Sequence, residues 1–200
     1  MRIPFLRDEG EELAARYRRE PDGTVLIEIR LNTIEQLFDT FDPAPFIATK
    51  DLDREAEDYI VESLREMAPR ESAKLVFYLP REQLRELDVS GLESALHDYF
   101  RYRLKARRAD MRALFRSGTH SLAIGVVLLI GCNALREFVV ADTSGTVNQI
   151  IGDGLLILAW VAMWRPVQIF VYDWWPIVKH CRLLRRLSAI AVEARTPPAI

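Results

Sequence analysis

The chain has 200 residues, of which 50% are hydrophobic and 28% are charged, and its net charge at neutral pH is −2. Its two cysteines, Cys132 and Cys181, have the spacing of neither a disulfide framework nor a zinc site. The composition therefore excludes a disulfide-stabilised domain.

The small net charge hides two halves of opposite sign. Residues 1–100 hold 13 Lys and Arg against 23 Asp and Glu, a net charge of −10, whereas residues 101–200 hold 14 against 6, a net charge of +8. We interpret the halves as an acidic head and a basic collar that binds lipid headgroups. A collar that docks nucleic acid, or the acidic face of the head, is the alternative. Anchoring is favoured, and no nucleic acid partner is expected.

The first 90 residues are predicted to form a small cytoplasmic α/β head. Pro21 and Gly23 indicate a turn, and Gly23 suits a left-handed position. Apolar residues then alternate over residues 24–31, which predicts a half-buried strand. Residues 14–19 are either its hairpin partner or a short helix.

Residues 37–46 combine two prolines, which hold the chain extended, with three phenylalanines, whose side chains favour burial. We predict a partner-binding segment here, and its contact residues are Phe41, Asp42, Pro43, Pro45 and Phe46. The alternative is that Phe38, Phe41 and Phe46 fill the small core.

Asp51 or Asp53 is predicted to cap a helix that ends near Met67. Residues 74–79 form a second strand, and this strand–helix–strand order favours parallel pairing through a right-handed crossover. The predicted fold class is α+β, with a two- or three-stranded sheet, a crossover helix and a transmembrane hairpin. So small a sheet is expected to need its long helix or a partner subunit to stay folded.

A further helix is predicted to begin at Ser90, with Glu93 completing a capping box. No proline or glycine interrupts the chain between Leu92 and Ser117. Residues 91–116 are therefore predicted as a basic juxtamembrane helix that continues into the first span.

Two apolar segments, residues 117–140 and 147–172, are predicted to form the transmembrane hairpin. Residues 117–135 contain no charge, and a helix of that length is about 28 Å long, close to the thickness of the hydrocarbon core. The second segment contains Asp153 and Arg165, but a single span would leave its tryptophans in water.

Positive charge borders the hairpin on one side. The basic residues there are Arg101, Arg103, Lys105, Arg107, Arg108, Arg112, Arg116, Lys179, Arg182, Arg185 and Arg186. The connecting loop, residues 141–146, has none, so we expect it outside the cell and both termini in the cytoplasm. Residues 1–10 lack the apolar region of a signal peptide. Arginine outnumbers lysine 23 to 4, which is typical of GC-rich bacterial genomes, so the expected location is a bacterial inner membrane.

Arg136 and Asp153 are predicted to form an intramembrane ion pair that locks the two spans near their outer end, with an ion or proton path as the alternative. Small residues also recur along the first span, which favours close packing either within the hairpin or in a homo-oligomer. That stripe consists of Ser117, Ser121, Gly125 and Cys132.

Aromatic and basic residues gather where the spans meet the cytoplasm, as in an aromatic belt. A lipid or quinone-like pocket is the less favoured alternative. The predicted lipid-interface residues are Arg103, Arg107, Arg108, Arg112, Arg116, Trp164, Arg165, Trp174, Trp175, Arg182 and Arg186. Residues 173–200 are predicted as a cytoplasmic tail, whose amphipathic helix after Pro176 lies on the inner membrane surface.

The sequence contains no recognised catalytic arrangement. His97, His120 and His180 share no metal-ligand spacing, and neither a Gly-rich phosphate loop nor a nucleophile elbow is present. The acidic cluster Asp39, Asp42, Asp51 and Asp53 lacks a glycine-centred loop, and its role stays open. We expect no catalytic residue, no metal and no cofactor.

Three segments resemble parts of a family of uncharacterised bacterial membrane proteins that have a small cytoplasmic domain and two spans. They are residues 37–46, with an Asp-Pro-x-Pro-Phe element at residues 42–46, residues 50–60, and Tyr172-Asp173-Trp174-Trp175-Pro176. The resemblance covers most of residues 24–176. It implies the architecture and no activity.

The preferred functional hypothesis is a non-enzymatic adaptor, scaffold or regulatory protein whose head binds a protein partner. The alternative is an oligomeric pore or transport component built from several hairpins, and a membrane enzyme is a distant third. Expected partners are membrane lipids, with a protein partner or further copies of the chain.

Overall fold

The computed structural model describes residues 16–39, 51–141 and 146–197. The chain divides into two compact units. The head unit consists of Met1–Lys105 and Cys181–Ile200, and the hairpin unit is Ala106–His180. The predicted partner-binding segment around Phe41 lies outside the described residues.

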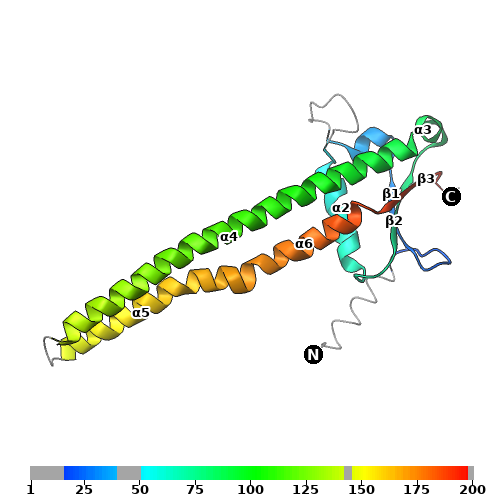
Figure 1. Cartoon of the computed structure of the whole chain (residues 1–200). Coiled ribbons are helices and arrows are strands. Elements are labelled where there is room, and N and C mark those ends of the chain that lie inside the picture. The colour runs from blue at the N-terminus through cyan, green and yellow to red at the C-terminus, as the bar shows by residue number, and fades with distance from the viewer. Residues whose placement is uncertain (1–15, 40–50, 142–145, 198–200) are drawn as a thin grey trace. The chain divides into compact units, whose positions relative to one another are not determined.

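The head unit contains a three-stranded sheet and the helices that cover it (Figure 1). Its elements are β1 (Val25–Arg30), η1 (Ile34–Leu37), α2 (Arg54–Glu66), β2 (Ala73–Tyr78), α3 (Arg81–Glu86), the start of α4 (Val89–Ala141), the end of α6 (Trp174–Leu187) and β3 (Ala191–Arg195).

Both predicted strands and the helix between them are confirmed. β1 pairs parallel to β2, with Ile27 opposite Leu75. Parallel neighbours need a long crossover, and α2 lies in the crossover between these two strands. Gly23 lies in the predicted turn before β1 with a φ of 86°, which glycine adopts without a steric cost. Of a hairpin partner for β1, the described residues show only an isolated bridge between Arg19 and Val25.

The third strand corrects the prediction for the end of the chain. β3 pairs parallel to β2, with Val192 opposite Leu75, so the sheet order is β1-β2-β3. The predicted tail was expected to lie on the membrane surface as an amphipathic helix. Instead its apolar side chains Leu184 and Leu187, on α6, are fully buried in the core of the head. An amphipathic pattern indicates only that one face of a helix is shielded from water, by lipid or by protein. Here the core of the head shields it.

The core of the head lies between the sheet and its helices. Ile27, Leu75 and Phe77 of the sheet are fully buried, as are Leu96 and Phe100 of α4. The core therefore draws on chain segments that lie before and after the hairpin unit in the sequence.

The helix ends confirm one predicted cap and correct another. The Asp53 carboxylate accepts hydrogen bonds from the backbone N–H groups of Glu55 and Ala56, at 2.9 and 3.2 Å, and so caps α2 as predicted. α4 begins at Val89 and not at Ser90. The Asp88 carboxylate accepts from the Gly91 backbone N–H and, at 2.6 Å, from the Ser90 hydroxyl, so Asp88 occupies the capping position expected for Ser90. Aspartate competes effectively there because its carboxylate accepts from the first N–H groups of the helix.

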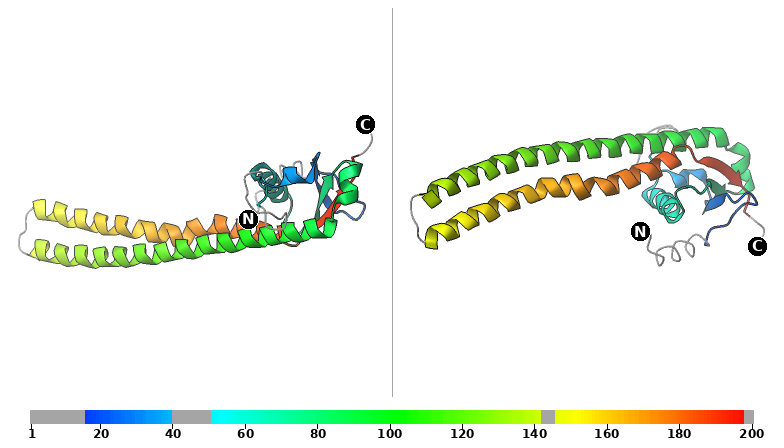
Figure 2. Two further views of the ribbon diagram at one scale, coloured as in Figure 1. Left: turned by 90° about the horizontal axis from the view of Figure 1, so that it is seen from above. Right: turned by 60° about the horizontal axis from the view of Figure 1, so that its bottom comes forward.

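In the hairpin unit, α4 continues as one helix to Ala141, and α5 (Thr146–Gln168) runs alongside it in both views of Figure 2. Buried small residues recur at intervals of seven on each helix. They are Gly118, Gly125 and Cys132 on α4 and Gly152, Ala159 and Pro166 on α5. An interval of seven keeps one seam of a helix facing its neighbour, as in a coiled coil, and small residues allow the backbones to approach.

α5 ends in a π-helical turn, η3 (Ile169–Asp173), which leads into α6. Pro166 lies inside α5 and has no N–H to donate to the preceding turn, so the regular hydrogen-bond ladder is interrupted nearby. The indole N–H of Trp174 donates to the Phe170 carbonyl at 2.9 Å. A Cβ atom at Gly118 would lie 2.8 Å from Ile169, so the π-helical turn packs directly on this glycine.

Candidate membrane and partner-binding surfaces

Two helices are long and apolar enough to cross a membrane. They fall within Val89–Phe138 and Gln149–Leu187, and only 17% of the most apolar window of each is buried in the protein. Core helices of water-soluble domains bury most of such a window, whereas here Val127, Phe138 and Trp160 are each 69–77% exposed. An apolar surface of this extent needs a non-aqueous environment or other protein to cover it.

Two of the three tryptophans predicted for the lipid interface are exposed on the hairpin unit, and Trp174 is half-buried. Trp164 is 69% and Trp175 is 51% exposed. Lys179 lies 5.6 Å from the centre of the Trp175 ring, and Arg165 forms an ion pair with Asp173 at 3.4 Å. Amphipathic rings beside paired charges are the side chains that membrane interfaces accommodate best.

Several arginines of the basic collar are engaged within the protein. Arg103 forms an ion pair with Glu57 across the head, and Arg107 pairs with Asp110 at 3.3 Å. Arg186 donates to the backbone carbonyl of Glu71 at 2.7 Å. Arg103 and Arg186, both predicted as headgroup contacts, therefore have structural partners in the head. The end of the chain also brings basic residues into the head unit, which holds 20 Lys and Arg against 24 Asp and Glu, a net charge of −4.

The Glu57 site joins α2 to α4. The Nε and Nη2 atoms of Arg103 donate to the two carboxylate oxygens of Glu57 at 2.8 and 2.9 Å, and the Tyr99 hydroxyl donates to the same carboxylate at 2.8 Å. Burial, reinforced by Glu57, raises the pKa of Tyr99. Burial lowers the pKa of Arg103, but the hydrogen bond to Glu57 and the negative charge nearby together raise it. The carboxylate thus accepts three hydrogen bonds from α4, which hold α2 against that helix.

A second charged network lies on the sheet face opposite the core. Arg195 donates to Glu193 at 2.7 Å and to Glu20 at 2.6 Å, and the Lys74 ammonium group contacts both glutamates. The hydrogen bond from Arg195 lowers the pKa of Glu193 to about 2, despite some burial, and Lys74 adds to the effect. This network ties β3 to β2 and to the turn before β1.

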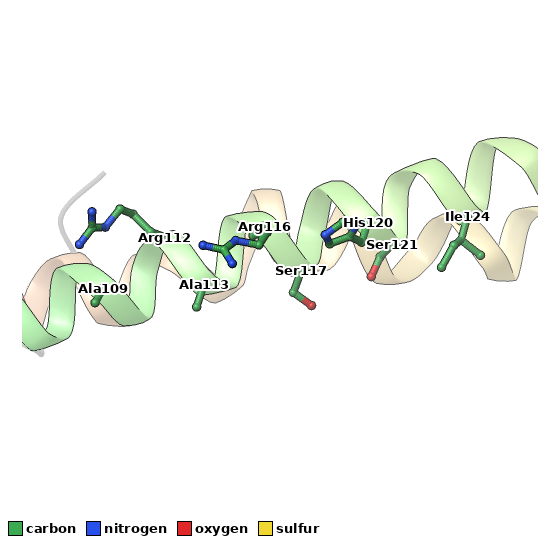
Figure 3. A pocket seen from close by; sticks show the side chains of 8 residues that line it. All are labelled: Ala109, Arg112, Ala113, Arg116, Ser117, His120, Ser121 and Ile124. Atoms are coloured by element: carbon green, nitrogen blue, oxygen red, sulfur yellow. The ribbon is translucent and has the colours of Figure 1, made fainter.

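A groove of about 630 Å³ runs along α4 where the collar meets the first span (Figure 3). We call it the basic groove. All its lining side chains come from α4: Ala109, Arg112, Ala113, Arg116, Ser117, His120, Ser121 and Ile124. Arg112 and Arg116 are exposed, and within the described residues neither has a carboxylate partner.

The predicted small-residue stripe divides between two faces of α4. Gly125 and Cys132 are buried in the hairpin seam, and a Cβ atom at Gly125 would lie 2.9 Å from Met163. Ser117 and Ser121 line the basic groove instead. Gly118 also lies in the seam. The sequence did not indicate it, because the predicted stripe begins with four-residue steps from Ser117, whereas the seam repeats every seven residues.

Arg136 and Asp153 are both exposed on the hairpin unit. No ion pair joins them within the part of the chain that the structure describes, so their pairing stays a prediction.

The other predicted residues are distributed over the head. Asp53 caps α2, and the Asp51 carbonyl accepts from the Asp39 backbone N–H at 2.9 Å, while Asp42 lies outside the described residues. The His97 ring lies 2.8 Å from the Ile190 carbonyl. Over the described ranges, no group of three potential metal ligands comes together.

Sequence reasoning did not identify an acidic groove of about 450 Å³ on the head unit. Its lining residues are Ile34, Glu35, Gln83, Glu86, Leu87, Asp88, Gly91 and Leu92. Glu35 and Glu86 are exposed, and neither has an ion-pair partner in residues 16–39, 51–141 and 146–197. In the sequence, the only indication of this groove is the pair of carboxylates Glu86 and Asp88, where α3 leads into α4. Glu35 lies far from them along the chain and joins them only when the head folds.

Comparisons of the chain with protein-family profiles, with curated proteins and with solved structures found no match. The resemblance to a family of two-span bacterial membrane proteins therefore remains an expectation from the sequence.

Proposed function

We propose that this protein is a non-enzymatic adaptor that the hairpin unit anchors in a bacterial inner membrane. The head and both chain ends lie in the cytoplasm, where the head binds a protein partner. The architecture is that of the two-span family that the sequence resembles.

The pairing of β2 with β3 around the apolar hairpin carries this proposal. These strands precede and follow the hairpin in the sequence, and they pair in one sheet. Both ends of the hairpin must then lie on the same side of any membrane that it crosses. Two spans satisfy this condition, whereas one does not. The basic residues that flank the hairpin support the cytoplasm as that side.

The acidic groove supports a protein partner with a basic contact segment. Unpaired, exposed carboxylates attract cationic segments and steer their approach. The segment with Phe41 and Phe46 supplies aromatic side chains, which carry much of the binding free energy at protein interfaces.

The test places a photo-crosslinking amino acid at Phe46, or at Glu86, in the full chain expressed in bacterial cells. The matched control is Tyr59, an aromatic residue on α2 that is 44% exposed. We expect the probes at Phe46 and Glu86 to give one adduct of defined mass. The yield of that adduct from Tyr59 should be at least fivefold lower. We also expect the combined substitution Glu35→Lys and Glu86→Lys to weaken the Phe46 adduct. Equal adducts at all three positions, or none, would contradict a specific partner.

A further inference from the structure

We propose that the basic groove on α4 is a specific binding site for one anionic phospholipid, whose phosphodiester lies at Arg112 and Arg116. This inference rests on the proposed function, because the groove meets lipid headgroups only if the first span lies in a bilayer. The inference goes further than the proposed function because it assigns one binding site and one class of ligand. The basic collar alone implies only a general attraction of anionic headgroups to many basic residues.

The charge of the groove is uncompensated. Arg103 and Arg107 have carboxylate partners, whereas Arg112 and Arg116 have none in the described part of the chain. These two arginines are four residues apart, a spacing at which like charges on a helix repel. A phosphate between them would relieve the repulsion and accept charge-assisted hydrogen bonds from both guanidinium groups.

The remaining lining residues fit a phosphate at this position. His120 follows Arg116 at the same interval, so the three side chains span about 12 Å along the helix. The Ser117 and Ser121 hydroxyls lie in the same groove and can donate to phosphate or glycerol oxygens. The small side chains of Ala109 and Ala113 leave the space that a headgroup needs.

The groove also continues into the apolar surface. Ser117 begins the uncharged run, and Ile124 at the far end of the groove is 62% exposed. Val127 and Leu128 lie beyond it, at 69% and 42% exposure. A headgroup at the arginines would thus have its acyl chains against exposed aliphatic residues, which a free phosphate would lack.

A second copy of the chain is a poorer occupant. Small residues at intervals of four do favour helix pairing. However, two copies in the same membrane orientation would bring Arg112 and Arg116 of each chain to the same level, where like charges oppose contact.

The experiment uses the full chain in phosphatidylcholine nanodiscs with increasing phosphatidylglycerol, and native mass spectrometry counts the lipids retained. The test variant is Arg112→Gln with Arg116→Gln. The control is Lys105→Gln with Arg185→Gln, which removes the same charge from exposed positions outside the groove.

We expect one retained phosphatidylglycerol per wild-type chain, an apparent affinity about tenfold lower in the test variant, and less than a twofold change in the control. Unchanged binding by the test variant would overturn the site, and so would equal losses in both variants, which indicate diffuse attraction. Displacement of the lipid by soluble glycerol phosphate would assign the groove to a free phosphate. A two-chain mass that Ser117→Leu abolishes would assign it to a second copy. Failure of the wild-type chain to enter phosphatidylcholine nanodiscs would overturn the proposed anchor as well.

Discussion

Buried charge in the described part of the head is confined to Glu57, whose side chain is 9% exposed. An ionised carboxylate is tolerated there because Arg103 and Tyr99 together supply three donors. The site fixes the position of α2 against α4 through directed bonds, whereas the neighbouring apolar contacts are not directional.

Replacing Glu57 by alanine would leave Arg103 and Tyr99 without their acceptor in a largely buried site. We expect a loss of about 2 kcal/mol in the free energy of unfolding, since Arg103 remains partly hydrated. Urea unfolding of the full chain in detergent would measure it. Glu62→Ala on the exposed side of α2 is the control, and equal effects of the two substitutions would contradict a structural role for Glu57.

The lowered pKa of Glu193 predicts how the stability of the head depends on pH. Its pKa is lowered from 4.5 to about 2 in the folded protein, so the folded state favours the ionised form. Its stabilising contribution is complete above the unfolded pKa of 4.5 and is lost as the pH falls from there toward 2. Unfolding temperatures measured between pH 6 and pH 2 should fall less steeply for Glu193→Gln than for the wild type. Parallel curves would show that Glu193 does not contribute.

At the scale of elements, α4 and α5 pack through glycine and other small residues. The backbones approach at Gly125, where a Cβ atom would lie 3.2 Å from the Ala162 carbonyl oxygen. Gly131 provides a contrast on the same helix, because a Cβ atom there would meet nothing within 4 Å.

Gly125→Leu should therefore disrupt the seam, whereas Gly131→Leu should not. Overpacking a close contact costs about 1–3 kcal/mol, while leucine at an open helical position is favourable. Thermal unfolding followed by circular dichroism in detergent would compare the two variants. Equal unfolding temperatures would contradict close packing at Gly125.

The end of α6 is a core element of the head. Leu187 is fully buried, whereas Leu158 on α5 is 53% exposed. We expect Leu187→Ala to lower the free energy of unfolding by about 3 kcal/mol, because it leaves a cavity in the core. Leu158→Ala, the same change on the apolar exterior, should cost less than about 1 kcal/mol. If the tail lay on the membrane surface, the two substitutions would have similar effects.

At the scale of the whole molecule, the hairpin lies in the sequence between β2 and β3, which are neighbouring strands of one sheet. Lys74 on β2 and Glu193 on β3 are 119 residues apart in sequence and 3.3 Å apart in space. The sheet is therefore complete only after both spans have been synthesised. Contacts of such large separation form slowly, because a long loop must close first.

This connectivity predicts the labelling of cysteines from outside the cell. In a background of Cys132→Ala and Cys181→Ala, we expect a membrane-impermeant maleimide to label Ser144→Cys, in the predicted external loop, in intact spheroplasts. Arg81→Cys, which lies on the head, should be labelled only after permeabilisation. Labelling of both positions in intact cells would contradict the proposed topology.

Local patterns determined much of the head. Alternating apolar residues predicted β1 and β2, and Asp53 caps α2 as expected, because these features depend on a few neighbouring residues. The acidic groove and the Glu57 site were not predictable, since each joins residues from separate elements. The contacts of Phe41 and the pairing of Arg136 with Asp153 stay predictions.

By itself, the sequence determined the two long apolar helices and the strand–helix–strand head, because length, periodicity and uninterrupted apolar character are local properties. Only the tertiary structure decided that the end of the chain returns to the head. A short strand of five residues, Ala191–Arg195, has too little local preference to be recognised alone, and its stability comes from pairing with β2. Tertiary packing also decided which glycines face α5 and that Arg103 pairs with Glu57, because these partners lie far along the chain.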